Sequence, residues 1–245
     1  MPPRSAVDIG ATASAGAKRR PCYARRMEKR TIDPPSEGQP AVERTTVGFN
    51  ARYTATTALV VVDVQNDFAD PKGSLSVEGA EALIPVINRE VRRATSSHTL
   101  VVATQDWHPE STPHFQKDGG IWPVHCVAGT WGAELHPAFD APADAHRVRK
   151  GEHGEDGYSG FTMRDPLTGR EIPTELEAVL RRIGIERIVV VGLATDYCVK
   201  ATALDAVRLR FEVHVLRDAV AAVNLDPDDG NRALAEMAGS GVRIG

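Results

Sequence analysis

Two groups of reactive side chains lie in this chain of 245 residues, one around a cysteine and one rich in histidine. The first contains Cys198, in the run GLATDYCVKATALDAV, where Thr195 as helix N-cap puts the cysteine in the first helical turn. There the free N–H groups and the helix dipole lower a thiol pKa and can hold an oxyanion. We therefore expect Cys198 to be a nucleophile, with an inert buried cysteine as the alternative.

Asp63 and Lys150 are the candidate partners of this cysteine. Asp63 ends an otherwise apolar run, ALVVVDVQNDF, where a carboxylate is costly unless it has a partner or a chemical task. Lys150 can pair with it and stabilise a thiolate, which leaves the carboxylate to shuttle protons as general base and acid. A structural salt bridge for Asp63 and a solvated surface position for Lys150 are the alternatives.

The second group places one carboxylate and three imidazoles within twenty residues, a donor set that suits zinc, iron or manganese. Its members are Asp106, His108, His114 and His125. On an extended segment, Asp-x-His puts both side chains on one side of the chain. Ordinary loop histidines are the alternative. Two nearby aromatic residues, Phe68 and Trp122, could sandwich a flat ring, or simply pack in the core.

These side chains require an α/β sheet that brings them together. From residue 57, short apolar runs alternate with helical periodicity, which is typical of strands covered on both faces. The predicted strands are 58–62, 98–104, 145–149, 185–192, 212–216 and 241–244. The predicted helices are 84–95, with Pro85 in its first turn, 173–183, 196–210 and 228–238. This alternation predicts an open parallel sheet, and the reactive residues follow strand ends, where ligands bind.

Composition and charge divide the chain into two parts. Residues 1–53 carry ten Lys and Arg against five Asp and Glu and show no sustained apolar period, whereas residues 54–245 carry 19 against 28. We predict a disordered basic tail over 1–53 and one catalytic domain over 54–245. The acidic charge of that domain argues against nucleic acid as a partner and favours a small-molecule substrate.

The cellular setting is predicted from cysteine usage and apolar runs. Three cysteines, Cys22, Cys126 and Cys198, stand at unrelated spacings, which argues against a disulfide framework and favours a cytoplasmic location. No apolar run reaches the roughly 18 residues of a membrane span, so we expect no membrane partner. Whether the protein forms a homo-oligomer stays open.

Several of these motifs, taken together and in order, resemble the nicotinamidase/pyrazinamidase branch of the isochorismatase-like hydrolases. They are VVDVQNDF, TQDWH, WPVHCVAGT, YSGF after Lys150 and GLATDYCVKATALDAV, and the likeness spans residues 58–244. The resemblance implies a three-layer α/β/α fold. It also implies hydrolysis of nicotinamide, and of pyrazinamide, to the carboxylic acid and ammonia through a cysteine thioester, with one divalent metal ion (Zn, Fe or Mn) as cofactor.

The resemblance also assigns roles to individual residues. The catalytic triad it implies is Asp63, Lys150 and Cys198, and the metal ligands are Asp106, His108, His114 and His125. The oxyanion hole is formed by the N–H groups of Ala194 and Cys198, with a cis peptide between Leu193 and Ala194. The substrate ring is flanked by Phe68 and Trp122, and Tyr158 forms a further wall of the pocket.

Two segments depart from the family pattern, and two rival functions stay open. The acidic run GEHGEDG after Lys150 is about one residue longer than in the relatives, and the basic tail has no counterpart in compact members. One rival is a metal-free cousin that acts on another small amide, a carbamoyl compound or a vinyl ether such as isochorismate. The other is a non-catalytic binding module on the same fold.

Overall fold

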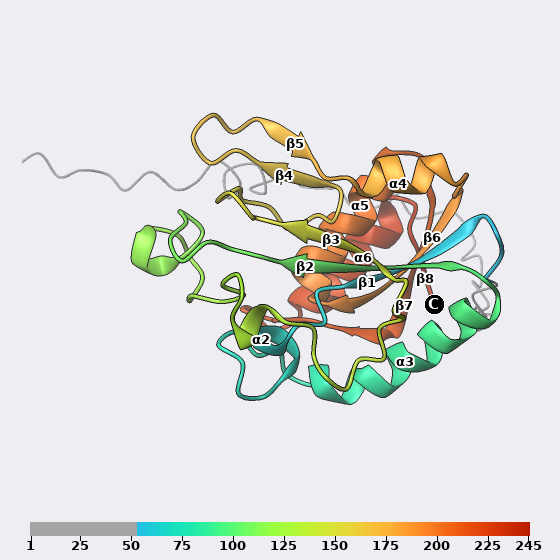
Figure 1. The fold of residues 1–245 in the computed structure, drawn as a ribbon, viewed down its shortest axis with the longest axis horizontal. Helices are drawn as coiled ribbons and strands as arrows, with labels where there is room; N and C mark the ends of the chain where they lie inside the picture. Colours follow the sequence, from blue (N-terminus) through green and yellow to red (C-terminus); the bar gives the residue numbers. More distant parts are fainter. Residues whose placement is uncertain (1–52) are drawn as a thin grey trace, which may run out of the picture. The chain divides into compact units, whose positions relative to one another are not determined.

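A computed structural model describes residues 53–245 of the chain, and in this part six parallel strands form one sheet in the order β3-β2-β1-β6-β7-β8 (Figure 1). The strands are β1 (Thr57–Val62), β2 (Leu100–Asp106), β3 (His146–Lys150), β6 (Arg187–Leu193), β7 (Glu212–Ala221) and β8 (Arg243–Ile244). All six predicted strands are therefore present, although β7 extends beyond the predicted end at 216. The predicted tail, apart from Tyr53, lies outside the described residues.

Helices cover both faces of this sheet, which confirms the three-layer α/β/α arrangement (Figure 1). One face carries α2 (Asn66–Ala69) and α3 (Ala80–Ser96), and the other carries α4 (Leu176–Arg182), α5 (Lys200–Arg208) and α6 (Asp229–Gly239). Alternate residues of β1 enter the two cores: Val60 and Val62 pack on the α4–α6 side, Leu59 and Val61 on the α3 side. Because the strand is buried on both faces, its sequence is a continuous run of apolar residues.

Helix α3 begins earlier than predicted, so the expectation of Pro85 in its first turn is wrong. The helix starts at Ala80, after Gly79 in a left-handed conformation, and Pro85 lies in its interior. Only Ala80 of the first four residues is buried, whereas Ile84, Ile87 and Val91 face the core. The apolar period therefore becomes visible only at residue 84, four residues after the helix has begun.

The helix predicted over 196–210 is split, and Thr195 is not its N-cap. A single π-helical turn, η3 (Thr195–Val199), precedes α5, and its N-cap is Ala194. The Ala194 carbonyl accepts the N–H of Val199, five residues along the chain, which widens this turn relative to an α-helix. Cys198 therefore lies in a π-turn.

Three kinds of short element were not predicted. They are the antiparallel hairpin of β4 (Thr162–Arg164) with β5 (Glu171–Pro173), helix α2, and the 3-10 turns η1 (Gln116–Asp118) and η2 (Trp131–Ala133). Each of these strands, helices and turns has only three or four residues, which is too few to show a hydrophobic period. The hairpin nevertheless packs against the segment that follows β3, because Asp156 forms a bridge with Arg164.

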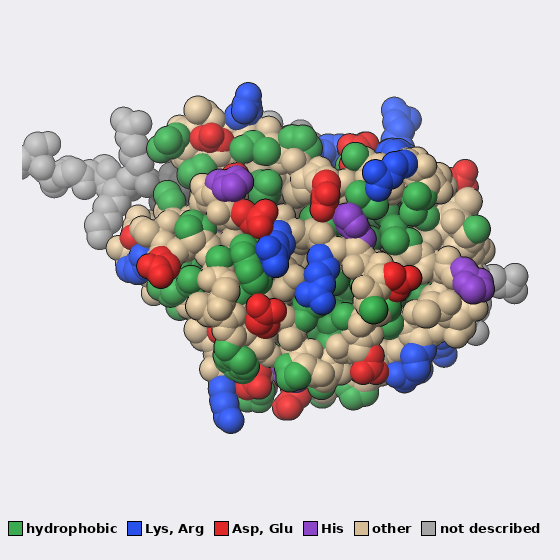
Figure 2. Space-filling model, viewed as in Figure 1, with side chains coloured by type: hydrophobic (Ala, Val, Ile, Leu, Met, Phe, Trp, Pro, Cys, Tyr) green, Lys and Arg blue, Asp and Glu red, His purple; other side chains and the backbone are tan. Residues whose placement is uncertain are grey.

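The surface of the described residues mixes charges of both signs. On the face drawn in Figure 2, Lys and Arg side chains are interspersed with Asp and Glu. A few large apolar side chains are exposed, among them Trp131, Leu167 and Leu225. Across residues 53–245, the helices are all too short or too polar to cross a bilayer.

Gly192 marks a close approach between the two central strands. It adopts φ +111° opposite Val62, and a Cβ added there would lie 2.1 Å from the Val62 carbonyl oxygen. Because both partners are backbone atoms in the middle of the sheet, neither can move away cheaply. The absence of a side chain at this position is therefore a requirement of the sheet.

We expect Gly192→Ala to lower the melting temperature strongly. Gly184→Ala is the matched control, because Gly184 also has a positive φ (+74°) but nothing within 4 Å of an added Cβ. The control should lose about 1 kcal/mol of unfolding free energy from backbone strain alone. Thermal and urea unfolding followed by circular dichroism measure both, and equal losses would contradict the steric argument.

Candidate active site

Three charged residues meet at the carboxyl ends of three adjacent strands. Asp63 directly follows β1, Asp106 is the last residue of β2, and Lys150 is the last residue of β3. The register of the sheet pairs Asp106 with Lys150, so that these two side chains leave the sheet side by side. The sequence prediction that these residues share one rim is confirmed in the placement of all three.

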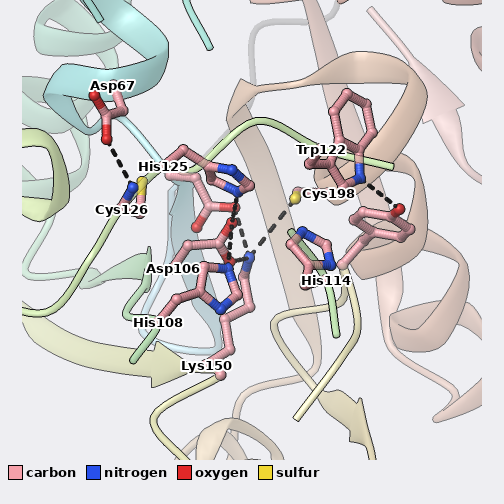
Figure 3. A network of polar contacts seen from close by, with 12 residues as sticks. Asp67, Asp106, His108, His114, Trp122, His125, Cys126, Lys150 and Cys198 are labelled. Atoms are coloured by element: carbon pink, nitrogen blue, oxygen red, sulfur yellow. Dashed lines mark hydrogen bonds and ion pairs between the residues drawn. The ribbon is translucent and has the colours of Figure 1, made fainter. Parts of the chain in front are cut away.

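Lys150 is the centre of this cluster. Its Nζ lies 2.8 Å from Asp63 Oδ2, donates a hydrogen bond to Asp106 Oδ1, and lies 3.6 Å from Cys198 Sγ (Figure 3). Only 1% of the residue is exposed, so the alternative of a solvated surface lysine is wrong. A single buried ammonium thus joins the cysteine to two carboxylates.

The charges in this cluster compensate one another. Burial opposes the charged form of Lys150, but the Asp106 and Asp63 carboxylates more than offset it and raise the pKa of the ammonium well above its ordinary value. Burial also works against ionised Asp106, yet the Lys150 ammonium holds the pKa of this carboxyl well below its usual range. For Asp63 burial prevails and raises the pKa, although Lys150 opposes it. Asp63 is therefore the carboxyl better suited to accept a proton.

The Asp63 carboxyl is held in place by a residue that sequence reasoning missed. Thr104 Oγ1 donates to Asp63 Oδ1 at 2.6 Å and lies 3.2 Å from Asp63 N, which donates back to the hydroxyl. Asp63 itself has φ +48°, a left-handed conformation that a non-glycine residue adopts at a cost. The only indication of this role in the sequence was that Thr104 carries a hydroxyl group near the end of the neighbouring strand.

Cys198 lies where the sequence placed it, but its ionisation differs from our expectation. Burial raises the pKa of the Cys198 thiol well above its ordinary value; Lys150 opposes this shift, and Asp63 adds to it. The expected lowering by a helix N-terminus is therefore wrong, because burial outweighs it. The reactive atoms of Cys198, Asp63 and Asp106 lie within 4.8 Å of one another, so a neighbouring carboxylate can take the thiol proton.

The segment before Cys198 has the backbone expected for an oxyanion site. The peptide between Leu193 and Ala194 is cis, as the family resemblance implied. Ala194 has an extended conformation at the start of η3, and both Ala194 and Cys198 line the same pocket. Their roles as oxyanion donors stay a prediction.

Three imidazoles converge beside this cluster. His108, His114 and His125 are buried, and each offers a ring nitrogen within 4.8 Å of the others (Figure 3). Asp106 Oδ2 points at the same space, 3.8 Å from His108 Nε2 and 3.9 Å from His125 Nε2. Asp106 therefore directs one carboxylate oxygen at Lys150 and the other at the histidines.

The chemistry of these donors fits a divalent metal ion. Both ring nitrogens of His108 are buried without a hydrogen-bond partner, which is costly for a ring left on its own. His125 Nδ1 bonds to the Pro123 carbonyl at 2.8 Å, and burial lowers the pKa of this imidazole to about 4. It is therefore neutral at pH 7 with a free Nε2 lone pair, the state in which imidazole binds metals.

Aromatic and aliphatic side chains form the pocket above these groups. The predicted residues Phe68, Trp122 and Tyr158 all line it, and Trp122 Nε1 donates to the Tyr158 hydroxyl at 3.0 Å. The remaining apolar wall, which sequence reasoning missed, consists of Leu75, Val77, Leu193, Tyr197 and Val223. Tyr197 packs edge-on against Trp122, with ring centroids 4.9 Å apart. The only indication in the sequence that Tyr197 lines the pocket was its position next to Cys198.

Comparisons with known proteins show which chains resemble this one. The model of the isochorismatase domain family matches residues 57–244. The "Nicotinamidase/pyrazinamidase" of Mycobacterium tuberculosis is 41% identical over 190 residues, which cover 76% of this chain and 97% of the relative.

Solved structures show the same likeness. The zinc complex of pyrazinamidase from Pyrococcus horikoshii has a TM-score of 0.69 and 42% identity, and the alignment covers 78% of this chain and 98% of that one. The nicotinate complex of PnC1 from L. infantum has a TM-score of 0.71 and 38% identity, covering 78% and 93%. Both neighbours bind their ligands on a fold that this chain shares.

We expect Lys150→Met to lower the free energy of unfolding by about 3–5 kcal/mol at pH 7, because two buried carboxyls lose their cation. Without Lys150, the pKa values of Asp63 and Asp106 in the folded protein rise. As the pH increases, these carboxyls therefore ionise in the unfolded chain before they ionise in the folded protein, which favours unfolding. The deficit relative to wild type should therefore grow as the pH rises from about 4 toward 8. Urea unfolding over this pH range measures it.

Lys200→Met is the control for this prediction, because Lys200 pairs at 3.3 Å with a half-exposed Glu236. It should cost less than about 1 kcal/mol. A Lys150→Met deficit that is equally small, or that does not change with pH, would contradict the buried-charge argument.

Proposed function

The chain belongs to the isochorismatase family, and we propose that it hydrolyses nicotinamide, and also pyrazinamide, to the carboxylic acid and ammonia. The observation that carries this proposal is the contact of one buried ammonium, Lys150, with Asp63, Asp106 and Cys198. Asp106 and Cys198 also line an aromatic pocket. An aromatic amide suits this site, because an apolar pocket can hold its ring next to a nucleophile, a proton carrier and three imidazoles. These features also speak against a non-catalytic binding module.

In the first half-reaction, Cys198 Sγ attacks the carboxamide carbon and its proton passes to Asp63. The N–H groups of Ala194 and Cys198 stabilise the oxyanion that forms on the amide oxygen. As the C–N bond breaks, Asp63 returns the proton to the nitrogen, which leaves as ammonia. The product of this half-reaction is a thioester between Cys198 and the substrate acyl group.

In the second half-reaction, water cleaves the thioester. Asp63 takes a proton from the water as its oxygen attacks the acyl carbon, and the C–S bond breaks. The proton then returns to the Cys198 sulfur while the carboxylic acid leaves. Lys150 stays protonated throughout and holds both Asp63 and the sulfur in position, a role for which its raised pKa suits it.

The pocket residues orient the substrate ring during both steps. Phe68 and Trp122 flank the ring, with the Tyr158 hydroxyl held by Trp122 Nε1. Asp106, His108, His114 and His125 would hold the divalent ion, which when bound supplies a coordination position for the pyridine nitrogen. Zinc is bound in the pyrazinamidase neighbour, and we propose zinc, iron or manganese for this chain.

Other expectations from the sequence stay predictions. A cytoplasmic location follows from the cysteine usage. The acidic net charge of residues 54–245 speaks against a nucleic-acid partner. The metal-free cousin is less favoured than a nicotinamidase, because three buried imidazoles with converging nitrogens would serve no purpose in it.

We expect Cys198→Ala to reduce ammonia release from nicotinamide by about 10⁴-fold or more, because the thioester cannot form. Cys126→Ala is the control, since it removes the other buried free thiol of the described residues and should stay within a few-fold of wild type. A coupled ammonia assay measures both. A Cys198→Ala protein with wild-type activity would rule out the thioester mechanism.

We expect removal of metal by a chelator to abolish nicotinamide hydrolysis and addition of Zn²⁺, Fe²⁺ or Mn²⁺ to restore it. Elemental analysis of the untreated protein should find about one ion per chain. The same assay with a panel of small amides, with and without chelator, tests the rival function. Full activity toward any of them in metal-free protein would favour the metal-free cousin.

A further inference from the structure

Asp156 contacts one of the three clustered histidines from outside the predicted site. Its Oδ1 lies 2.8 Å from His114 Nδ1, and the residue belongs to the acidic segment 151–157. The His114 side chain is 6% exposed and the Asp156 side chain 47%, so the aspartate closes the outer side of a buried imidazole. The sequence offered no signal for it beyond an acidic loop.

This contact fixes which nitrogen of His114 faces the cluster. A carboxylate can only accept, so Nδ1 carries the proton and donates to Asp156. The lone pair then resides on Nε2, on the opposite side of the ring from Asp156. Carboxylate partners of this kind set the tautomer and orientation of metal-binding histidines and raise the basicity of the ligand nitrogen.

The backbone holds Asp156 firmly in this position. Its N–H donates to the Arg164 carbonyl at 2.8 Å and its carbonyl accepts the Arg164 N–H at 2.5 Å, which ties it to strand β4. Thr112 Oγ1 also donates to the Gly154 carbonyl at 3.4 Å and connects the His114 loop to the same segment. The β4–β5 hairpin thus supplies a fixed base for the carboxylate.

The same segment also supports a second histidine. Gly151 has φ +82°, and a Cβ added there would lie 2.6 Å from His108 Nδ1. The His108 ring therefore packs directly on the Gly151 backbone. Residues 151–157 touch both His108 and His114, which makes the segment an outer wall of the histidine cluster.

We propose that Asp156 is a positioning residue that sets the metal affinity of this site by fixing the ring and the proton of His114. The proposal rests on the proposed function in one respect, namely that the three histidines and Asp106 bind a divalent ion. It assigns to the acidic segment 151–157 a role in setting how tightly that ion binds. Asp156 does not touch the substrate and takes no part in proton transfer.

The test is the Zn²⁺ dissociation constant of the full chain, measured by competition with a chromophoric chelator. Asp156→Ala should bind Zn²⁺ about 10–100-fold more weakly, and Asp156→Asn, which keeps an acceptor oxygen, should fall between it and wild type. Glu155→Gln is the matched control. It removes the same charge one residue away, where the carboxylate accepts the His153 N–H instead, and should leave the constant within twofold of wild type.

A second measurement separates ring positioning from general damage to the fold. ¹⁵N chemical shifts of the His114 imidazole in the metal-free protein should report the Nδ1–H tautomer in wild type and Glu155→Gln, and loss of that preference in Asp156→Ala. Melting temperatures of the metal-free variants identify any that do not fold, and Asp156→Asn then carries the comparison.

The outcomes distinguish the two proposals. If wild type binds Zn²⁺ but Asp156→Ala binds it as tightly as Glu155→Gln does, or keeps the wild-type tautomer, this inference is overturned and the proposed function stands. If wild type binds no Zn²⁺, the metal centre of the proposed function fails and takes this inference with it. A weaker constant together with a changed tautomer supports the inference.

Discussion

The burial of one positive charge, Lys150, constrains much of the site around it. An ammonium that is 1% exposed is stable only if anions surround it, and two strands supply them: Asp63 from the end of β1 and Asp106 from the end of β2. Without the lysine, burying either carboxylate in its ionised form would carry a large cost in free energy. The order β3-β2-β1 at one side of the sheet therefore brings the lysine and the two carboxylates together, so that their charges compensate one another.

Asp106 links this charge balance to the histidine cluster. Oδ1 accepts from Lys150, and Oδ2 lies within 4 Å of two imidazoles. Gln65 fixes the aspartate between them, since its side chain accepts the Asp106 N–H and donates to the Asp106 carbonyl. One carboxylate thus contacts both the imidazoles and Lys150, which lies against Cys198, and this explains why the two groups share a single pocket.

The parallel sheet and the residues at its rim could be predicted from the sequence because each depends on a local pattern. Two-sided burial gives continuous apolar strands, and a charged residue at the end of such a strand is conspicuous. Contacts between distant segments leave no such pattern, so Thr104 and Asp156 were missed. The thiol pKa of Cys198 was wrongly predicted for the same reason: helix position is local, whereas burial by the whole fold decides the ionisation.

The two halves of the site are held by different means, and this difference bears on how function diverges in the fold. Asp63 and Lys150 lie at the ends of strands, and Cys198 lies in the π-turn that follows β6, whereas the three imidazoles come from an irregular loop. That loop is held by isolated contacts, such as the bridge between His108 and Val127. Another is the hydrogen bond from the Cys126 N–H to the buried Asp67 carboxylate (Figure 3). A loop anchored in this way can change its length or its side chains while the sheet keeps Asp63 and Lys150 in place. The acidic segment 151–157 after Lys150 lies against His108 and His114 of this loop.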